Sequence, residues 1–112
     1  MRAKGTGKAM QKTIDKMVDR IVRHFDPEQV ILFGSRARGD ARPDSAVDLL
    51  VVMPFTGSRS EKQIDIRMEL RDIPVAKDIV VTTPEDFAWR RLQAGTIERP
   101  ASAEGRTMYV RA

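Results

Sequence analysis

Apolar and polar positions follow two different periods along the chain, and the changes of period mark the elements. From Met10 to Phe25 apolar residues recur at spacings of three and four, which predicts an amphipathic helix. Asp26-Pro27 should end this helix. Short apolar runs at Val30–Phe33 and Val47–Met53 predict two strands. The second run contains Asp48 as its only charge, which favours a strand covered on both faces.

Helices and strands continue to alternate in the second half. Ser60 and Gln63 have the spacing of a capping box, before a predicted helix that carries Ile64 and Met68 and ends near Ile73-Pro74. A strand is expected next, at about Val75–Thr82. The helix after it should begin at Thr83-Pro84-Glu85-Asp86, carry Phe87 and Leu92 on its core side and end at Gly95. A short helix that reaches Gly105, with Pro100 in its first turn, and a strand at Thr107–Val110 complete the chain.

Length and composition predict a single domain. The chain has 112 residues, of which 41% are hydrophobic and 32% charged. We expect a flexible basic N-terminus at residues 1–9 and one α/β (α+β) domain at residues 10–112. The longest apolar run, Leu49–Met53, is far too short to cross a bilayer, and no apolar secretory segment follows the N-terminus. Because cysteine is also absent, we expect a cytoplasmic protein.

The basic charge of the chain favours partners that carry phosphate. The net charge is +4, which suits nucleotides and nucleic acids equally. A solvated N-terminal tail would also explain the excess, because several lysines and arginines lie there. Direct nucleic-acid binding is therefore an alternative function. The chain lacks the basic stripe interleaved with aromatic residues that single-strand binders use.

The first strand leads into a glycine-serine turn that suits phosphate binding. Gly34 has no side chain, so a triphosphate could approach the backbone there. Ser35 and the N–H groups that follow could bind phosphate oxygens at the start of a helix. Arg36 and Arg38 are further candidates for phosphate contact.

Two aspartates near strand starts are candidate metal ligands. Residues two apart on a strand face the same way, so Asp48 shares its face with position 46, which holds Ala46. Asp78 begins the third apolar run and would join Asp48 if the two strands were neighbours. Carboxylate oxygens suit Mg²⁺, which bridges proteins to substrate phosphates. The pattern therefore predicts a magnesium–nucleotide site with Asp48 and Asp78 as metal-binding and catalytic residues.

This segment resembles the signature Gly-Ser, ten residues, Asp-x-Asp of the DNA polymerase β-like nucleotidyltransferase superfamily, in particular its minimal nucleotidyltransferase (MNT) branch. Gly34 and Ser35 match the first pair, and residues 36–45 supply the ten. Asp48 matches the second aspartate of the pair, whereas the first is replaced by Ala46. The third family carboxylate falls on Asp78.

The resemblance extends to Gly95-Thr96-Ile97 and to residues 104–109, so it covers nearly the whole chain. It implies a nucleotidyltransferase fold, a mixed β-sheet flanked by α-helices, with Mg²⁺ as cofactor. It also implies transfer of a nucleoside monophosphate, AMP if the substrate is ATP, to a hydroxyl group. Many MNT proteins are antitoxins paired with a HEPN-domain toxin ribonuclease, and some adenylylate a tyrosine of the toxin. A HEPN-domain toxin is therefore the implied partner.

Ala46 changes what the resemblance implies for activity. An alanine methyl group cannot coordinate a metal ion, so we expect the chain as written to bind nucleotide but to transfer it poorly or not at all. Three explanations of Ala46 remain open. The substitution was engineered, the protein is a natural pseudoenzyme, or Asp44 acts as a substitute ligand. A non-catalytic antitoxin or adaptor is the alternative function. The sequence also leaves open the acceptor, the base preference and the oligomeric state.

Three other features have ordinary structural explanations. Gly5-Thr6-Gly7-Lys8 is similar to the end of a phosphate-binding P-loop but lacks the preceding strand and first glycine. His24 falls in the last turn of the first helix, where a cation interacts well with the helix dipole. Trp89 with Arg90-Arg91 is interpreted first as a half-buried aromatic group and second as a patch that faces a partner.

Overall fold

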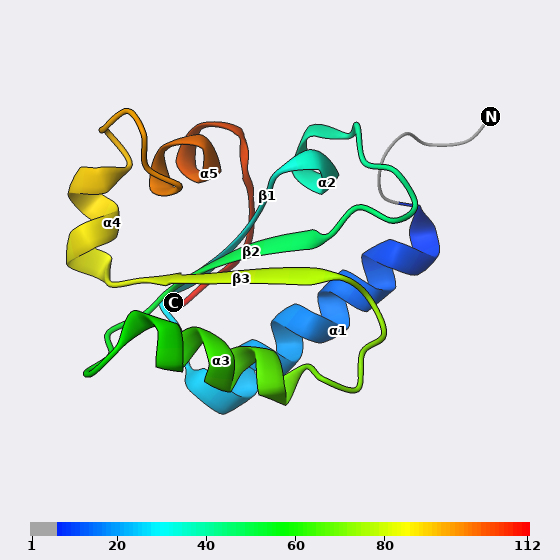
Figure 1. Cartoon of the computed structure of the whole chain (residues 1–112), viewed down its shortest axis with the longest axis horizontal. Helices are drawn as coiled ribbons and strands as arrows, with labels where there is room; N and C mark the ends of the chain where they lie inside the picture. Colours follow the sequence, from blue (N-terminus) through cyan, green and yellow to red (C-terminus); the bar gives the residue numbers. More distant parts are fainter. Residues whose placement is uncertain (1–6) are drawn as a thin grey trace.

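A mixed sheet of four strands organises residues 7–112, the part of the chain that the computed structural model describes (Figure 1). The strands are β1 (Gln29–Phe33), β2 (Val47–Val52), β3 (Lys77–Thr82) and β4 (Arg106–Val110), and their order in the sheet is β3-β2-β1-β4. β1 pairs antiparallel with both β2 and β4, whereas β2 and β3 are parallel. The expected α/β (α+β) fold is confirmed.

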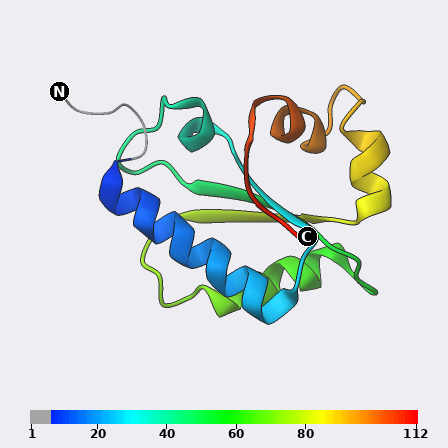
Figure 2. The ribbon, with the colours of Figure 1, turned by 180° about the vertical axis from the view of Figure 1, so that it is seen from behind.

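Helices cover both faces of this sheet. α1 (Lys8–Phe25) and α3 (Arg59–Glu69) lie on one face, and the shorter helices α2 (Ser35–Arg38), α4 (Pro84–Arg90) and α5 (Glu98–Glu104) lie on the other (Figures 1 and 2). None of the helices in the described range is long and apolar enough to span a membrane. The expected mixed sheet flanked by helices is therefore what the structure shows.

The two faces of the sheet contribute to separate cores. Leu49 and Val51 of β2 belong to the larger core, under α1 and α3, whereas Leu50 belongs to a smaller core with Ile31 and Ala101. This division follows from the alternation of side chains along a strand. The larger core also includes Ile14, Met17, Ile21, Val30, Leu32, Ile66, Leu70, Ile79 and Val81. Even-numbered positions of β2 therefore face α2, α4 and α5.

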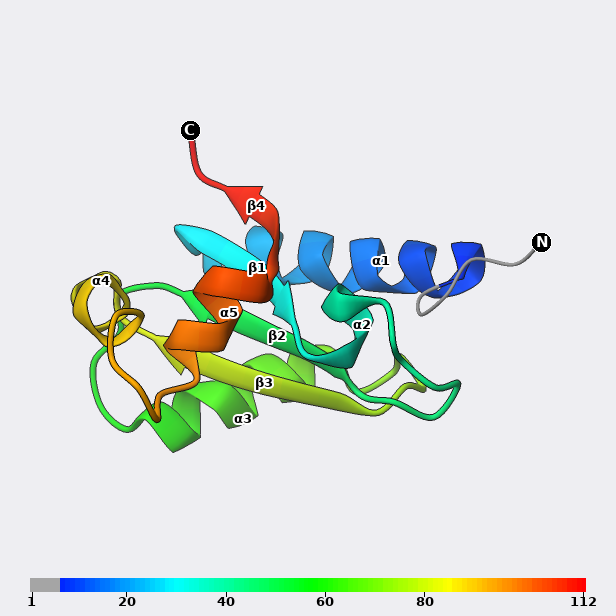
Figure 3. The ribbon, with the colours of Figure 1, turned by 90° about the horizontal axis from the view of Figure 1, so that it is seen from above.

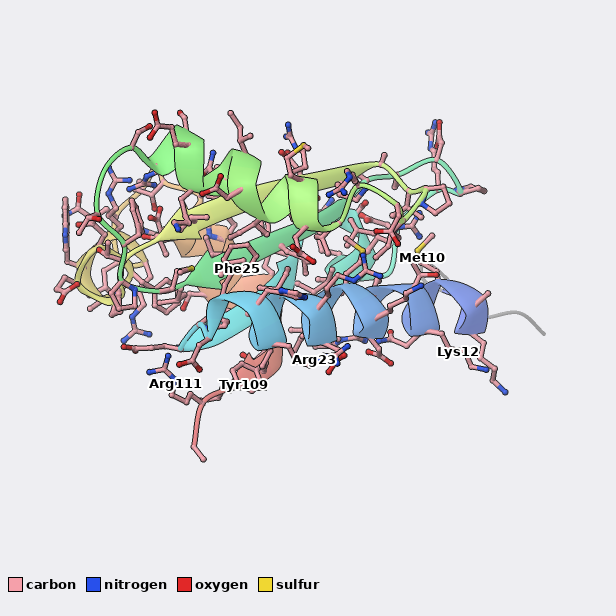
Figure 4. All side chains as sticks on the ribbon, turned by 90° about the horizontal axis from the view of Figure 1, so that it is seen from below. Met10, Lys12, Arg23, Phe25, Tyr109 and Arg111 are labelled. Carbon is pink, nitrogen blue, oxygen red and sulfur yellow. The ribbon has the colours of Figure 1, made fainter. Side chains whose placement is uncertain are left out.

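The first helix agrees with its predicted range except at its start. α1 begins at Lys8 and not at Met10, and it ends at Phe25 as expected. Residues 1–6, which include most of the expected flexible segment and part of the P-loop-like segment, lie outside the described residues. At the other end of the helix, Arg111 Nη2 lies 3.3 Å from Asp26 Oδ2, which ties the chain after β4 to the end of α1 (Figure 4).

The predicted cap of α3 is wrong by two residues. Ser58 is the N-cap, and its Oγ accepts a hydrogen bond from the Glu61 N–H at 3.3 Å. Ser60 lies inside the helix. Gln63 does not reach back to the cap, because its Oε1 accepts a hydrogen bond from the Val81 N–H at 3.0 Å. The side chain expected to cap the helix instead fastens α3 to β3.

The start of α4 is as predicted, but its end is not. The Thr83 Oγ1 accepts a hydrogen bond from the Asp86 N–H at 3.1 Å, which is the expected N-cap. Phe87 packs against the smaller core. Leu92, expected on the core side, is 72% exposed because α4 ends before it. Gly95 lies in the turn that follows and does not end the helix itself.

Gly105 lies where the end of α5 meets β1, at a point with no room for a side chain. A Cβ atom there would lie 2.2 Å from the Ala101 carbonyl oxygen, 2.7 Å from the Ile31 Cγ2 and 2.9 Å from the Leu32 carbonyl oxygen. We expect Gly105→Ala to lower the free energy of unfolding by about 1–3 kcal/mol, measured by urea unfolding, because backbone atoms must shift. Gly7→Ala is the control, since nothing lies within 4 Å of its added Cβ. Equal effects of both changes would contradict the steric explanation.

Candidate functional site

Asp48 and Asp78 lie side by side on the two parallel strands. They are register partners across β2 and β3, and neighbouring strands are about 4.8 Å apart. The sequence could not establish this pairing, because it depends on the order of strands in the sheet. Asp48 is half-buried and Asp78 is exposed. Both side chains belong to the face that also carries α2, α4 and α5.

The environment of Asp48 opposes its negative charge. Burial raises the pKa of Asp48 above its ordinary value, and the nearby Asp78 carboxylate raises this pKa further. The Arg38 guanidinium acts in the opposite direction and lowers the pKa of Asp48. Two carboxylates held this close together are an arrangement that a cation would stabilise.

We expect Asp48→Asn to raise the Tm of the metal-free protein. A carboxyl group whose pKa is raised by folding stabilises the fold when protonated and loses that contribution as the pH rises, so ionised Asp48 opposes folding at neutral pH. The asparagine variant removes this charge at nearly constant volume. Thermal unfolding at neutral pH without magnesium measures the effect, with the exposed Asp44→Asn as control. A lower Tm for Asp48→Asn would contradict the expectation.

Gly34 places the chain backbone directly against Asp48. Its φ of 75° lies in the left-handed region, which favours glycine, and an added Cβ would lie 2.1 Å from Asp48 Oδ2. Ser35 follows as the first residue of α2, where N–H groups have no partner within the helix. The structure therefore brings the turn at Gly34 and Ser35 together with Asp48. Their contact with phosphate stays a prediction.

Arg36 is buried, and its guanidinium group is directed at the loop between α2 and β2. Its side chain donates hydrogen bonds to the Ser45 carbonyl oxygen from Nε at 3.2 Å and from Nη2 at 2.9 Å. Nη2 also donates to the carbonyl oxygens of Arg42, at 3.2 Å, and Pro43, at 3.3 Å. These contacts hold the loop that leads to Ala46. The predicted contact of Arg36 with phosphate stays a prediction, and these bonds give the residue a structural role.

Arg38 is exposed and lies close to the carboxylate pair. Its Nε is 3.3 Å from Asp40 Oδ2, and its Nη1 is 3.9 Å from Glu104 Oε1 at the end of α5. The charge of Arg38 also acts on the pKa of Asp48. Of the two arginines that the sequence suggested, Arg38 is therefore the one whose charge is accessible next to the site.

Ala46 lies just before β2, two positions from Asp48. Within residues 7–112, no group of three or more His, Cys, Asp and Glu side chains is placed to hold a metal ion. The pair Asp48 and Asp78 still fits Mg²⁺, which commonly takes one or two protein carboxylates and fills its other positions with phosphate oxygens and water. Asp44 is exposed in the preceding loop. The protein side of the site thus consists of two carboxylates.

Glu98 is a buried carboxylate that the sequence analysis did not single out. Its exposed fraction is 1%, and its Oε2 accepts a hydrogen bond from Thr82 Oγ1 at 2.8 Å. Arg90 Nη1 lies 3.7 Å and Arg59 Nη1 4.0 Å from the same oxygen. Glu98 therefore fastens the starts of α3 and α5 and the end of α4 to the end of β3. A glutamate in the first turn of a helix is so common that no sequence signal distinguishes this one.

Comparisons with known proteins agree with this geometry. Residues 14–102 match the sequence model of a family described as nucleotidyltransferase domain. No protein with curated function matches the chain. A crystal structure of a protein from Sulfolobus solfataricus that is assigned as a nucleotidyltransferase is 22% identical, with a TM-score of 0.66 over 92% of this chain and 82% of that chain. A mutant of the toxin–antitoxin MntA-HpeT is 13% identical, with a TM-score of 0.59 over 87% of this chain and 73% of that chain. At these identities the two solved structures show a shared fold.

Proposed function

Because the chain belongs to the nucleotidyltransferase domain family, we propose that it binds a magnesium-bound nucleoside triphosphate, ATP, beside Asp48 and Asp78. The observation that carries the proposal is the in-register pair of these carboxylates, with the backbone of Gly34 against Asp48. The family match covers this whole segment. The spacing of the motif in the sequence and the register of its two carboxylates therefore both support the proposal.

Each residue has a proposed part in binding and orienting the nucleotide. Gly34 lets the backbone lie against Asp48, and Ser35 with the first N–H groups of α2 would bind phosphate oxygens. Asp48 and Asp78 would hold Mg²⁺, which when bound neutralises phosphate charge and favours departure of pyrophosphate. Arg38 would add an accessible positive charge next to the carboxylates.

We propose that the reaction is transfer of AMP to a hydroxyl group of a partner protein, a HEPN-domain toxin. The similarity to the solved MntA-HpeT toxin–antitoxin supports a partner of this kind. Ala46 gives the site a methyl group where a third carboxylate would complete it, so transfer by this chain should be weak or absent. A non-catalytic antitoxin that binds the same partner is the second candidate, and Ala46 is the observation that favours it.

Calorimetric titration with ATP tests the nucleotide site. We expect ATP to bind, magnesium to strengthen the binding, and Ser35→Ala and Asp78→Asn each to weaken it by about tenfold, as when one charged or hydrogen-bonding contact is lost. Asp65→Asn, exposed on α3 on the other face of the sheet, is the control and should bind as the unchanged chain does. Absence of ATP binding, or equal affinity in all four proteins, would contradict the proposed site.

Co-purification with a HEPN-domain protein from the same organism separates the two candidates. The adaptor binds this partner with equal affinity with and without ATP and leaves it unmodified. The enzyme adds an AMP group, which mass spectrometry detects on a hydroxyl-bearing residue of the partner. A HEPN-domain protein that neither binds nor is modified would argue against the partner, whereas the ATP titration would still test the nucleotide site.

A further inference from the structure

Exposed apolar side chains gather at the end of α4 and in the turn that joins it to α5. Trp89, Leu92 and Ile97 have exposed fractions of 49%, 72% and 45%. Arg91 and Arg99 are exposed in the same segment. We call these five residues the α4–α5 patch. Folding alone does not explain it, because its apolar groups contribute little to either core.

The turn that displays the patch is fixed by hydrogen bonds. Thr96 Oγ1 lies 2.8 Å from the Arg90 carbonyl oxygen and 3.0 Å from that of Gln93, and it accepts a hydrogen bond from the Arg99 N–H at 3.2 Å. Arg99 Nη1 also donates to the Leu92 carbonyl oxygen at 3.5 Å. The exposed position of Leu92 is therefore set by the turn. A surface organised in advance in this way loses less conformational entropy on binding a partner.

The two arginines of the patch have charges that the described part of the chain does not neutralise. Arg91 lies with its guanidinium carbon 6.0 Å from the centre of the Phe87 ring. Neither Arg91 nor Arg99 forms an ion pair within residues 7–112, whereas the neighbouring Arg90 pairs with buried Glu98 at 3.7 Å. The complementary surface would be apolar at its centre and carry carboxylates at its rim.

The composition of the patch fits a protein partner better than a nucleic acid. Tryptophan and arginine are the residues that dominate the binding energy of protein interfaces. Single-stranded nucleic acids are bound by aromatic stacking and basic grooves, and the branched aliphatic groups of Leu92 and Ile97 serve neither purpose. These two residues are a large part of the exposed apolar surface here. A protein contact uses all five members of the patch.

The patch is on the same side of the sheet as the carboxylate pair. Figure 3 looks onto this side, with α5 in front of the sheet, α4 past the end of β3, and α1 and α3 on the far side. Asp48 and Asp78 share the face that these shorter helices cover. A protein bound at the patch would therefore lie on the same side of the sheet as the proposed nucleotide site, toward the other end of β2 and β3.

We propose that the α4–α5 patch is the surface on which this chain holds its protein partner, through an apolar contact that carboxylates of the partner surround. This inference rests on the proposed function, because the partner is the protein to which that function is directed. The nucleotide site and the docking surface are separate sets of residues, so each can be disabled without the other.

The test measures the affinity of a purified HEPN-domain protein from the same organism for variants of the full chain, by biolayer interferometry. Leu92→Asp and Arg91→Glu should each weaken binding by about tenfold or more, as removal of central interface residues does. Ile64→Asp and Met68→Asp are matched controls, because these side chains are 55% and 52% exposed on α3, behind the sheet. The controls should bind within about twofold of the unchanged chain. ATP affinity, measured on every variant, reports whether each remains folded.

If the patch variants and the controls bound the HEPN-domain protein with equal affinity, the proposed docking surface would be wrong. The proposed function would still stand in that case, provided that the chain binds ATP and the partner. Failure of the unchanged chain to bind the HEPN-domain protein would overturn both the partner and its surface. Binding of a single-stranded RNA oligonucleotide that Trp89→Ala weakens, with no change in protein binding, would also overturn the proposal, because the patch would then be a nucleic-acid surface.

Discussion

Ala46→Asp is expected to raise the rate of nucleotide transfer by about 100-fold or more, because small errors in the placement of reacting groups cost factors of this size. Position 46 lies just before β2, two residues from Asp48, which is in register with Asp78, so we expect the new carboxylate to join the existing pair. The measurement is transfer of label from alpha-labelled ATP, with magnesium, to a HEPN-domain protein and to host-lysate proteins. The chain as written and the variant are compared side by side.

Two further variants make this comparison decisive. Asp48→Asn, added to Ala46→Asp, should abolish the gained activity, because only two carboxylates then remain. Asp44→Ala in the unchanged chain tests whether the loop supplies a substitute ligand. If the unchanged chain already transfers nucleotide and Asp44→Ala stops it, the expected loss of activity is wrong. If Ala46→Asp labels neither the partner nor the lysate, the adaptor is favoured.

The sheet and the approximate position of the site could be predicted from local pattern. Short apolar runs such as Val30–Phe33 and Val47–Met53 identify strands whatever their neighbours are, and the turn at Gly34 has a strong local signal. The pairing of Asp48 with Asp78 had no such signal, because residues 30 apart in sequence meet only when β3 lies parallel beside β2. The sequence therefore suggested the members of the site, and the sheet order determined which of them are neighbours.

Errors in the predictions arose where two local signals compete. Ser58 with Glu61 and Ser60 with Gln63 both have capping-box spacing, and the first is used because Gln63 binds the backbone of β3. The predicted helix continues to Gly95 with Leu92 on its core side, but α4 ends at Arg90 and the turn that follows leaves Leu92 exposed. In both cases a tertiary contact or turn decides the outcome, and neither is visible in a short window of sequence.

Arg36 shows how one sequence signal can serve two physical roles. An arginine next to a glycine-serine turn suggests phosphate binding, yet the structure buries Arg36 to an exposed fraction of 5%. Its guanidinium group donates to the carbonyl oxygens of Arg42, Pro43 and Ser45. The loop has few other bonds, among them that of the Arg42 N–H to Ser45 Oγ at 2.8 Å. Removal of Arg36 should therefore make the loop that leads through Ala46 to the site more mobile.

We expect Arg36→Met to lower the free energy of unfolding by about 2–4 kcal/mol, because three carbonyl groups lose their charged donor. Arg38→Met is the control, since Arg38 is exposed, and it should change stability by no more than about 0.5 kcal/mol. Urea unfolding gives both values, and hydrogen exchange of residues 42–46 should increase in Arg36→Met alone. If Arg36→Met instead weakened ATP binding without loss of stability, its main contact would be with phosphate. A loss of both stability and ATP affinity would mean that the loop itself shapes the nucleotide site, because Arg36 then acts on the nucleotide through the loop that it holds.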